Sequence, residues 1–530
     1  MADAPEADVV VIGSGAGGAA VAWALARAGV AVTVVEAGPR YDYWSDYRLD
    51  RADWEQERFP HKASRRTYTV APTQTIVERP ELRSWSVTTG ADNTTDHRLS
   101  WGYQHVQGVG GTTLHYTGEA HRLHPAAMRL RSRFGVGADW PFDYAELEPY
   151  YVEAERLIGA AGWSYDPVRW RSAPYPLPPH PLSYASQKIA AGFRVLGLSL
   201  APGPLGILSQ AYGDRPPCNY CANCIRGCPR ADKASADVTF IAAALATGRC
   251  TVLPERQVVH LAAGPEDRVS HAEAVDAQGQ RHRIMARVFV VAGGAVHTPR
   301  LLLASTGAHA PHGLANESGE VGRNFMETVS WVSSGLHPEP LGSHRGVPSD
   351  AICWDYNAPD AIPGVVGGCR LSVGAGQADL LGPIAHATRL VGGFGRAHKA
   401  RMSQVFGRAL TVVGVAECLP NPRAFVDLDP EEADPRGVPL ARIHSWLEQG
   451  EIERLAFMRE RARAVLEAAG VEGIVEEYGT YDHFAATHVF GTCRMGRDPE
   501  ASVVDPTGRS HRWRNLYVAD ASVFPSSGGG

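Results

Sequence analysis

The sequence predicts an α/β protein of two or three domains, one of which contains a parallel sheet. The chain has 530 residues, and a domain usually holds about 100–200. Near the N-terminus, a short β-branched run is followed by a glycine-rich turn, a helical pattern and a second apolar run. Strand, small-residue turn and helix occur again in that order at 287–305. Alternating strands and helices favour a parallel sheet covered by helices.

The stretch ADVVVIGSGAGGAAVAWALARAGVAVTVVEAG contains the N-terminal unit. Its run at 9–12 suits a buried parallel strand and leads into a turn with the spacing G-x-G-x-x-G. A helical pattern then ends at Gly29, and a second strand at 30–35 brings Glu36 to a point 23 residues after the first glycine. The three glycines of the turn are Gly13, Gly15 and Gly18.

This spacing has a physical reason in a dinucleotide site. The glycines allow a tight turn, close approach of a pyrophosphate, and close packing of helix on strand. The helix N-terminus attracts the phosphates, and an acid at the tip of the second strand can bind a ribose hydroxyl. A glycine-rich turn alone could be structural, but here strand, turn, helix, strand and acid are all in register. The unit predicts dinucleotide binding without distinguishing NAD from FAD.

Composition excludes several classes of partner. The formal net charge is -6, so nothing indicates binding to nucleic acid or to an anionic membrane. No apolar run approaches the ~18 residues of a membrane span. The N-terminus has neither a basic n-region nor a twin arginine, so we expect no export signal of its own. Nine cysteines, five of them scattered, favour a reducing compartment. We therefore expect a cytoplasmic protein, or one exported only with a signal-bearing partner.

Four of the cysteines lie within eleven residues, in CNYCANCIRGCP. Their spacing, C-x₂-C-x₂-C-x₃-C-P, is the ferredoxin type for iron–sulfur ligation. Zinc fits less well, because structural zinc sites usually use two C-x₂-C pairs about 15–20 residues apart. A loop without metal is the third alternative. The candidate ligands, for a [4Fe-4S] or [3Fe-4S] cluster, are Cys218, Cys221, Cys224 and Cys228.

Outside these motifs, three stretches predict local structure. The segment 447–471 has the pattern of an amphipathic helix, with apolar residues on one face and Arg and Glu expected on a solvated face. The proline-rich stretch at 171–185 predicts an irregular connection. A strand and turn from 287 onward lead to a helix that we expect to start near Pro299. In the helix predicted at 447–471, the apolar face consists of Ile452, Leu455, Met458, Ala462, Val465 and Leu466.

Several stretches together resemble one enzyme family. They are WGYQHVQGVGGTTLHYTGEAHR (101–122), DWPFDYAELEPYYVEAERLIGAAG (139–162), RVFVVAGGAVHTPRLLLAS (287–305), HVFGTCRMG (488–496) and NLYVADASVFPSS (515–527). With the N-terminal unit, they resemble the glucose-methanol-choline (GMC) family of FAD-dependent oxidoreductases, in the family's order and along the whole chain. The pattern is most similar to the sugar, gluconate and alcohol dehydrogenase branch, in which a cysteine-rich stretch precedes a lysine.

The resemblance implies a fold and a domain division. We expect a Rossmann-like FAD-binding domain and a second, α+β substrate domain with an antiparallel sheet flanked by helices. The FAD-binding domain would combine residues 1–135, 218–325 and 486–530. The substrate domain would combine residues 136–217 and 326–485.

The resemblance also implies FAD-binding residues. The N-terminal glycines and Glu36 match the ADP-binding part of the family site. His115 lies where this branch has His or Asn beside the isoalloxazine; some relatives attach flavin covalently through a His here, and most bind it noncovalently. Either Val258 or Val259 resembles the strand residue that contacts adenine, and we favour Val259. The remaining matches are Gly110, Gly111 and Thr112 along the flavin, and Asp520 near the flavin phosphates and ribityl chain.

His488 matches the family's catalytic base. Oxidation of an alcohol requires removal of the hydroxyl proton while hydride moves from carbon to flavin N5. A neutral imidazole can take that proton near pH 7, because its reference pKa is about 6.5. The family continues beyond SVFPSSGG into a turn that supplies a second catalytic group, whereas this chain stops at Gly530. We expect that group to be missing by truncation or supplied from elsewhere. His483 is a weak candidate for it, because YDHFAATHV resembles a helix approaching the motif.

These observations predict FAD-dependent oxidation of an alcohol CH–OH group, with a sugar, polyol or glycoside favoured. Electrons would pass to an acceptor other than oxygen, such as a cytochrome or a small partner subunit, with the cysteine cluster as the one-electron relay. Two alternatives stay open. One is an oxygen-using alcohol or sterol oxidase of the same family, and the other is a flavin-binding electron-transfer subunit without turnover.

Overall fold

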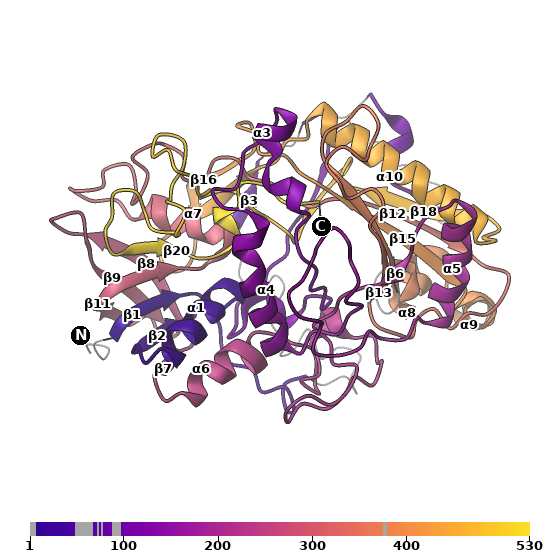
Figure 1. Ribbon diagram of the computed structural model, residues 1–530, viewed down its shortest axis with the longest axis horizontal. Coiled ribbons are helices and arrows are strands. Elements are labelled where there is room, and N and C mark those ends of the chain that lie inside the picture. The colour runs from indigo at the N-terminus through magenta and orange to yellow at the C-terminus, as the bar shows by residue number, and fades with distance from the viewer. Residues whose placement is uncertain are drawn as a thin grey trace.

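The fold is described from a computed structural model of the chain. It contains a parallel sheet at one end and a larger antiparallel sheet at the other (Figure 1). Statements about structure below refer to the residues that it describes, which are 7–47, 67–71, 74–75, 78–86, 97–374 and 379–529. In this part of the chain, no helix is both long and apolar enough to cross a membrane.

The five-stranded parallel sheet confirms the Rossmann-like prediction. Its strand order is β20-β11-β1-β2-β7, and every neighbouring pair runs parallel. The helix α1 (Ala16–Arg27) follows β1 and packs on the sheet through buried small residues. The strands β1 and β2 are rich in β-branched residues and buried almost throughout, as expected for a parallel sheet covered on both faces. The strands are β1 (Ala7–Ile12), β2 (Val32–Val35), β7 (Cys250–Leu253), β11 (Ala286–Val291) and β20 (Leu516–Val518).

The second large sheet has seven antiparallel strands, in the order β4-β18-β12-β15-β14-β13-β6. The helices α5 (Tyr184–Val195) and α10 (Gln449–Ala468) pack against each other and against this sheet (Figure 1). The strands are β4 (Trp85–Ser86), β6 (Ala201–Pro202), β12 (Val329–Leu336), β13 (Ser349–Cys353), β14 (Cys369–Gly374), β15 (Ala409–Ala416) and β18 (Ile474–Gly479).

The helix α10 confirms the amphipathic pattern and corrects one detail. Leu455, Met458 and neighbouring apolar residues are buried as expected. However, Arg454 and Glu451 are also buried, and they form an ion pair with each other. The expectation that all charged residues of this helix face solvent is therefore wrong, because a buried guanidinium is tolerated where a carboxylate compensates its charge.

The described residues also form three smaller sheets. An antiparallel sheet contains β8 (Arg256–Ala263), β9 (Val269–Asp276) and β10 (Arg281–Ile284). A mixed sheet contains β3 (Tyr68–Val70), β16 (Phe425–Ala433) and β17 (Pro439–His444). The third is the parallel pair β5 (Leu99–Tyr103) and β19 (His483–Ala486). The segment before His488 is thus a strand, so the expected helix there is wrong: pairing with distant β5 decided its conformation.

The remaining helices include one further correction. The helix α7 (Gly294–Ala304) begins at the glycine turn after β11, and Pro299 lies inside it rather than at its start. The segment 171–183 has no helix or strand, which confirms the irregular connection. The other α-helices are α3 (Leu130–Phe134), α4 (Tyr144–Ile158), α6 (Ala242–Ala246), α8 (Pro383–Ala385) and α9 (Gly395–Val405).

Candidate active site

A cavity of about 810 Å³ lies at the carboxyl ends of β1, β2 and β11. This edge of a parallel sheet is the usual location of ligands in α/β folds. The cavity brings together most of the predicted site residues, from segments far apart in the sequence. Those that line it are Gly13, Gly15, Glu36, Gly111, Thr112, His115, His488 and Asp520. Gly18, Gly110 and Val259 are not among its lining residues.

The glycine turn fits a dinucleotide. A Cβ added to Gly13 would lie 2.4 Å from the Ala292 carbonyl oxygen, and one added to Gly18 would lie 2.1 Å from the Gly13 oxygen. These two positions need glycine for the turn and for helix packing. A Cβ added to Gly15 would meet no protein atom within 4 Å, so Gly15 leaves open space at the helix N-terminus where a pyrophosphate can approach.

Glu36 lies at the tip of β2 and is buried. Its carboxylate accepts hydrogen bonds from the Ser14 amide at 3.0 Å, the Ser14 hydroxyl at 2.7 Å and the Gly38 amide at 2.9 Å. Burial raises the pKa of Glu36, and these hydrogen bonds oppose the rise. The carboxylate is therefore fixed beside the glycine turn, as a residue that binds a ribose hydroxyl should be.

Asp520 links the end of β20 to the start of α7. It accepts hydrogen bonds from the Gly294 amide at 2.9 Å and the Thr298 hydroxyl at 2.5 Å. On the adenine side predicted for the cavity, Val258 lines the wall, whereas Val259 packs in a separate cluster with Val275. The pairing of β8 with β9 shifts register between Val258 and His260, and Val258 lines the cavity whereas Val259 does not.

The segment predicted to lie along the flavin forms a tight 3₁₀ turn, Gly111–Leu114. Gly110 and Gly111 have positive φ angles of 107° and 55°, which suit glycine. The Thr113 hydroxyl donates to the Gly110 carbonyl at 2.6 Å. His115 follows the turn and lines the cavity, with its Nδ1 3.2 Å from the Ile225 carbonyl oxygen. The wall of the cavity thus contacts the cysteine-rich loop directly.

Lys233 fastens that loop to the wall. Its side chain is fully buried, and Nζ donates to the carbonyl oxygens of Leu114 and Tyr116, at 3.0 Å each, and of Cys224, at 2.7 Å. The first two carbonyls flank His115. Burial lowers the pKa of Lys233 to about 8, while nearby thiol and carboxyl groups act in the opposite direction. The sequence had marked this lysine only as part of a family motif.

The four clustered cysteines do not form a metal site as placed. In the described chain, no three His, Cys, Asp or Glu side chains come together in a group that could hold a metal ion, and all four thiols are free. Burial raises the pKa of Cys218 to about 12 and of Cys228 to about 11, and the Cys228 thiol donates to Asp232 at 3.2 Å. The structure therefore does not support the cluster that the spacing predicted.

His488 projects its imidazole into the cavity from the segment after β19. The Thr328 hydroxyl fixes its backbone, accepting from the His488 amide at 2.9 Å and lying 3.1 Å from its carbonyl oxygen. Desolvation by the surrounding protein lowers the pKa of His488, although the residue is open to the cavity; Glu119 has a smaller opposing effect, and Arg370 reinforces the lowering. A lowered pKa keeps the imidazole neutral at pH 7, the form that accepts a proton.

His483 lies apart from this cavity. It is buried, with Nδ1 2.8 Å from the Ser84 hydroxyl and 3.1 Å from Asp482, and it is absent from the cavity lining. His483 was only a weak candidate for the second catalytic group, and its place outside the cavity lining agrees with that interpretation.

Sequence reasoning missed two groups in the cavity. Glu119 and His121 line it near His488, and a pair formed by His105 and His297 lines another part, with their Nε2 atoms 3.3 Å apart. Burial lowers the pKa of His105 to about 4. All four residues lie in the stretches that carry the family resemblance, but no spacing rule distinguished them from their neighbours.

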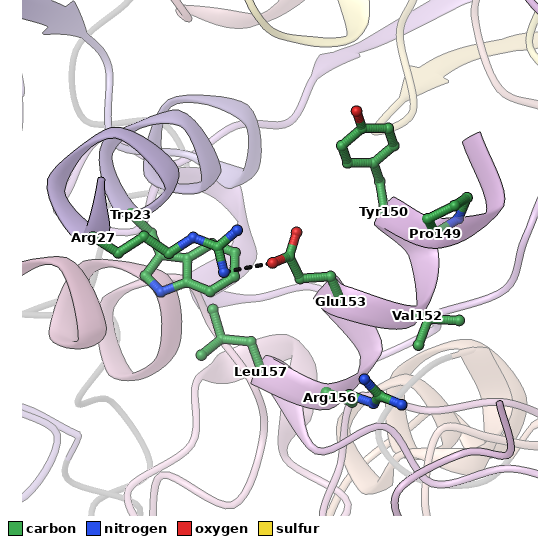
Figure 2. Close-up of a pocket in the computed structure, with 8 residues that line it drawn as sticks. All are labelled: Trp23, Arg27, Pro149, Tyr150, Val152, Glu153, Arg156 and Leu157. Carbon is green, nitrogen blue, oxygen red and sulfur yellow. Dashed lines mark ion pairs between the residues drawn. The ribbon is translucent and has the colours of Figure 1, made fainter. Parts of the chain in front are cut away.

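A second, shallow pocket lies between α1 and α4 (Figure 2). There Arg27 stacks over the Trp23 ring at 4.2 Å and pairs with Glu153 at 2.5 Å. This pocket shares no residue with the nucleotide cavity, so the chemistry predicted from the sequence belongs to the larger cavity.

Comparison with known proteins agrees with the geometry. Residues 105–329 and 420–530 match the two family models described as GMC oxidoreductase, and residues 11–64 match an NAD(P)-binding Rossmann-like domain. A fructose dehydrogenase large subunit of Gluconobacter japonicus is 28% identical over 98% of this chain and 94% of its own. A 2-methyl-1,2-propanediol dehydrogenase of Mycolicibacterium austroafricanum is 29% identical over 99% and 92%. A paromamine 6'-oxidase of Streptomyces fradiae is 29% identical over 98% and 87%.

Solved structures share the fold. The crystal structure of pyridoxine 4-oxidase from Mesorbium loti superposes with a TM-score of 0.60 at 20% identity, covering 99% of this chain and 96% of that one. Formate oxidase from Aspergillus oryzae superposes with a TM-score of 0.61 at 16% identity, covering 99% and 95%. Together with the matched family models, the cavity and its glycine turn lead to one conclusion: the chain belongs to the GMC family of FAD-dependent oxidoreductases.

Proposed function

We propose that this chain oxidises a CH–OH group of a sugar, polyol or glycoside, with His488 as the base. The observation that carries the proposal is that His488 and the dinucleotide-binding glycines line the same cavity. When bound, FAD supplies the hydride acceptor. The glycine turn, Glu36 and Asp520 would hold it, and His488 takes the proton of the substrate hydroxyl at its imidazole nitrogen.

The two-domain division follows the same logic. We propose that residues 1–135, 218–325 and 486–530 bind FAD, and that residues 136–217 and 326–485 bind substrate. The parallel sheet draws its strands from the first set. All strands of the antiparallel sheet except β4 come from the second set, which supports the division. The strand β4 belongs to the first set in sequence but pairs in the antiparallel sheet.

We further propose an electron acceptor other than oxygen, in a partner subunit. Support comes from a relative whose name includes a large subunit. Other relatives are named as oxidases, so the acceptor needs a direct test. The cysteine cluster stays a prediction, to be tested by iron and acid-labile sulfide analysis of anaerobically purified protein. We assign it no electron-transfer step, because the thiols do not gather around a metal position.

Bleaching of the flavin by a panel of alcohols and sugars tests the proposed function. We expect bleaching under anaerobic conditions, and slow reoxidation when air is admitted. Fast reoxidation with hydrogen peroxide formation would favour an oxidase, and the absence of bleaching by any alcohol would favour a subunit without turnover. His488→Ala should keep FAD but reduce it at least 100-fold more slowly, since positioned acid–base groups contribute about 10²–10⁴-fold. Reduction at the native rate would exclude His488 as the base.

A further inference from the structure

Glu119 lines the same cavity as His488 and interacts with it electrostatically. Its backbone pairs with Leu205 across an isolated bridge, and the next residue, Ala120, donates its amide to the Pro204 carbonyl at 3.0 Å. The preceding Gly118 has a positive φ of 88° and would clash with Ile207 if it carried a Cβ. The backbone therefore fixes the position from which this carboxylate enters the cavity.

The Glu119 carboxylate is also oriented by its neighbours. Arg370 of β14, nearly fully buried, donates from Nη2 to Glu119 and from Nη1 to the Ser372 hydroxyl. His121 lies with Nδ1 3.9 Å from the same carboxylate. The Glu119 side chain keeps 16% of its surface exposed, and a carboxylate can accept about four hydrogen bonds. Acceptor capacity thus remains on the side that lines the cavity.

The charges around His488 balance. Within the described residues, the two charged groups that act on its pKa are Glu119 and Arg370, and they have opposite signs. Burial alone would raise the pKa of Glu119, but the positive charges of Arg370, His121 and His488 together hold it below its ordinary value. The carboxylate is therefore ionised at pH 7 and neutralises the guanidinium. A substrate carboxylate would face Glu119 without a compensating cation.

We propose that Glu119, oriented by Arg370 and His121, accepts a hydrogen bond from a second hydroxyl of the substrate while His488 acts on the reacting one. This subsite selects neutral polyhydroxylated alcohols. It disfavours mono-alcohols, which bring no second hydroxyl to donate to the Glu119 carboxylate, and aldonic acids, which bring a second negative charge. The inference rests on the proposed function and specifies the substrate class for the same site.

The test compares wild type with Glu119→Gln in anaerobic flavin reduction. The probes are a hexitol, a deoxyhexitol lacking one hydroxyl, and the corresponding hexonate. In wild type, we expect the hexitol to have the highest kcat/KM. In Glu119→Gln, KM for the hexitol should rise about tenfold and KM for the deoxyhexitol less than twofold, because only the former loses a charge-assisted hydrogen bond. The hexonate should bind about tenfold more tightly, since Arg370 is no longer neutralised.

The expected increase in affinity for the hexonate distinguishes a loss of the subsite from misfolding, because a misfolded protein would lose affinity for all three probes. Glu153→Gln is the matched control: it removes another arginine-paired glutamate, in the separate pocket of Figure 2, and should change none of the three constants. Equal changes for all three probes in Glu119→Gln, or none, would overturn the subsite. If no alcohol bleaches the wild-type flavin, the proposed function fails as well. Bleaching with unchanged selectivity refutes the subsite alone.

Discussion

Replacing Lys233 with methionine would detach the cysteine-rich loop from the wall of the FAD cavity. Methionine has nearly the length of the lysine stem and keeps the buried packing, so the change removes mainly the ammonium. That group donates to the carbonyls of Leu114, Tyr116 and Cys224. The first two belong to the segment around His115, which lines the cavity. The variant therefore tests whether this buried cation supports the flavin-side wall.

The magnitude follows from the carbonyls that lose their donor. The Cys224 oxygen also accepts from the Gly227 amide at 3.3 Å, so most of the loss falls on Leu114 and Tyr116. A buried carbonyl without a partner destabilises a fold by about 1–3 kcal/mol. Relief from burying the ammonium, whose pKa burial lowers to about 8, offsets part of this. We expect a net loss of roughly 2–4 kcal/mol in the free energy of unfolding.

Thermal unfolding of the holoprotein measures this effect. For a chain of 530 residues, the expected loss corresponds to a fall in Tm of roughly 2–4 °C, and flavin fluorescence should show FAD release at a correspondingly lower temperature. Lys188→Met is the matched control: Lys188 forms a surface ion pair with Glu339 at 2.8 Å, so its loss should leave Tm unchanged. Equal Tm values for wild type and Lys233→Met, with FAD retained, would refute the structural role of the ammonium.

Two further predictions concern the cofactor and the base. Gly15→Val should abolish FAD binding without unfolding the apoprotein, because Gly15 has a φ of -66° and open space where the new side chain would project; retention of flavin after gel filtration would contradict this. The acidic limb of kcat/KM should lie below pH 6.5, since the lowered pKa of His488 keeps the base neutral to lower pH, and activity is lost as pH falls through that pKa. A pH–rate profile with its limb above 6.5 would refute that assignment.

Local rules were sufficient for the parts of the protein with short-range causes. The glycine spacing predicted the turn after β1, because Gly18 packs against the backbone of Gly13 and Gly15 leaves open space at the helix N-terminus, although Gly13 is also required by the distant Ala292 carbonyl. The pattern at 447–471 likewise predicted α10. Prediction failed where distant segments decide the outcome. β19 is a strand because it pairs with β5, and Val258 rather than Val259 lines the cavity at a register shift in the pairing of β8 with β9.

The candidate site shows the same division. His488 was predictable because it lies in a continuous motif. Glu119 and Arg370 are 251 positions apart in the sequence. They meet because β14 of the antiparallel sheet, which contains Arg370, approaches the segment that contains Glu119. Neither residue has a neighbour in sequence that indicates an ion pair. The residues that we expect to determine substrate selectivity could therefore not be predicted from the sequence alone, whereas those that we expect to bind the cofactor could.

The cysteine-rich loop illustrates why spacing alone is a weak guide to metal binding. Ligation needs sulfurs that converge on one point, but among the described residues no three metal-binding side chains come together, and the Cys228 thiol donates a hydrogen bond to Asp232 instead. Cys224 is buried, and its own carbonyl oxygen accepts a hydrogen bond from Lys233. Gathering the four sulfurs would require this loop to rearrange against the wall that it supports at His115. If iron is found, Lys233→Met should change iron content and FAD retention together, since one ammonium fixes both segments.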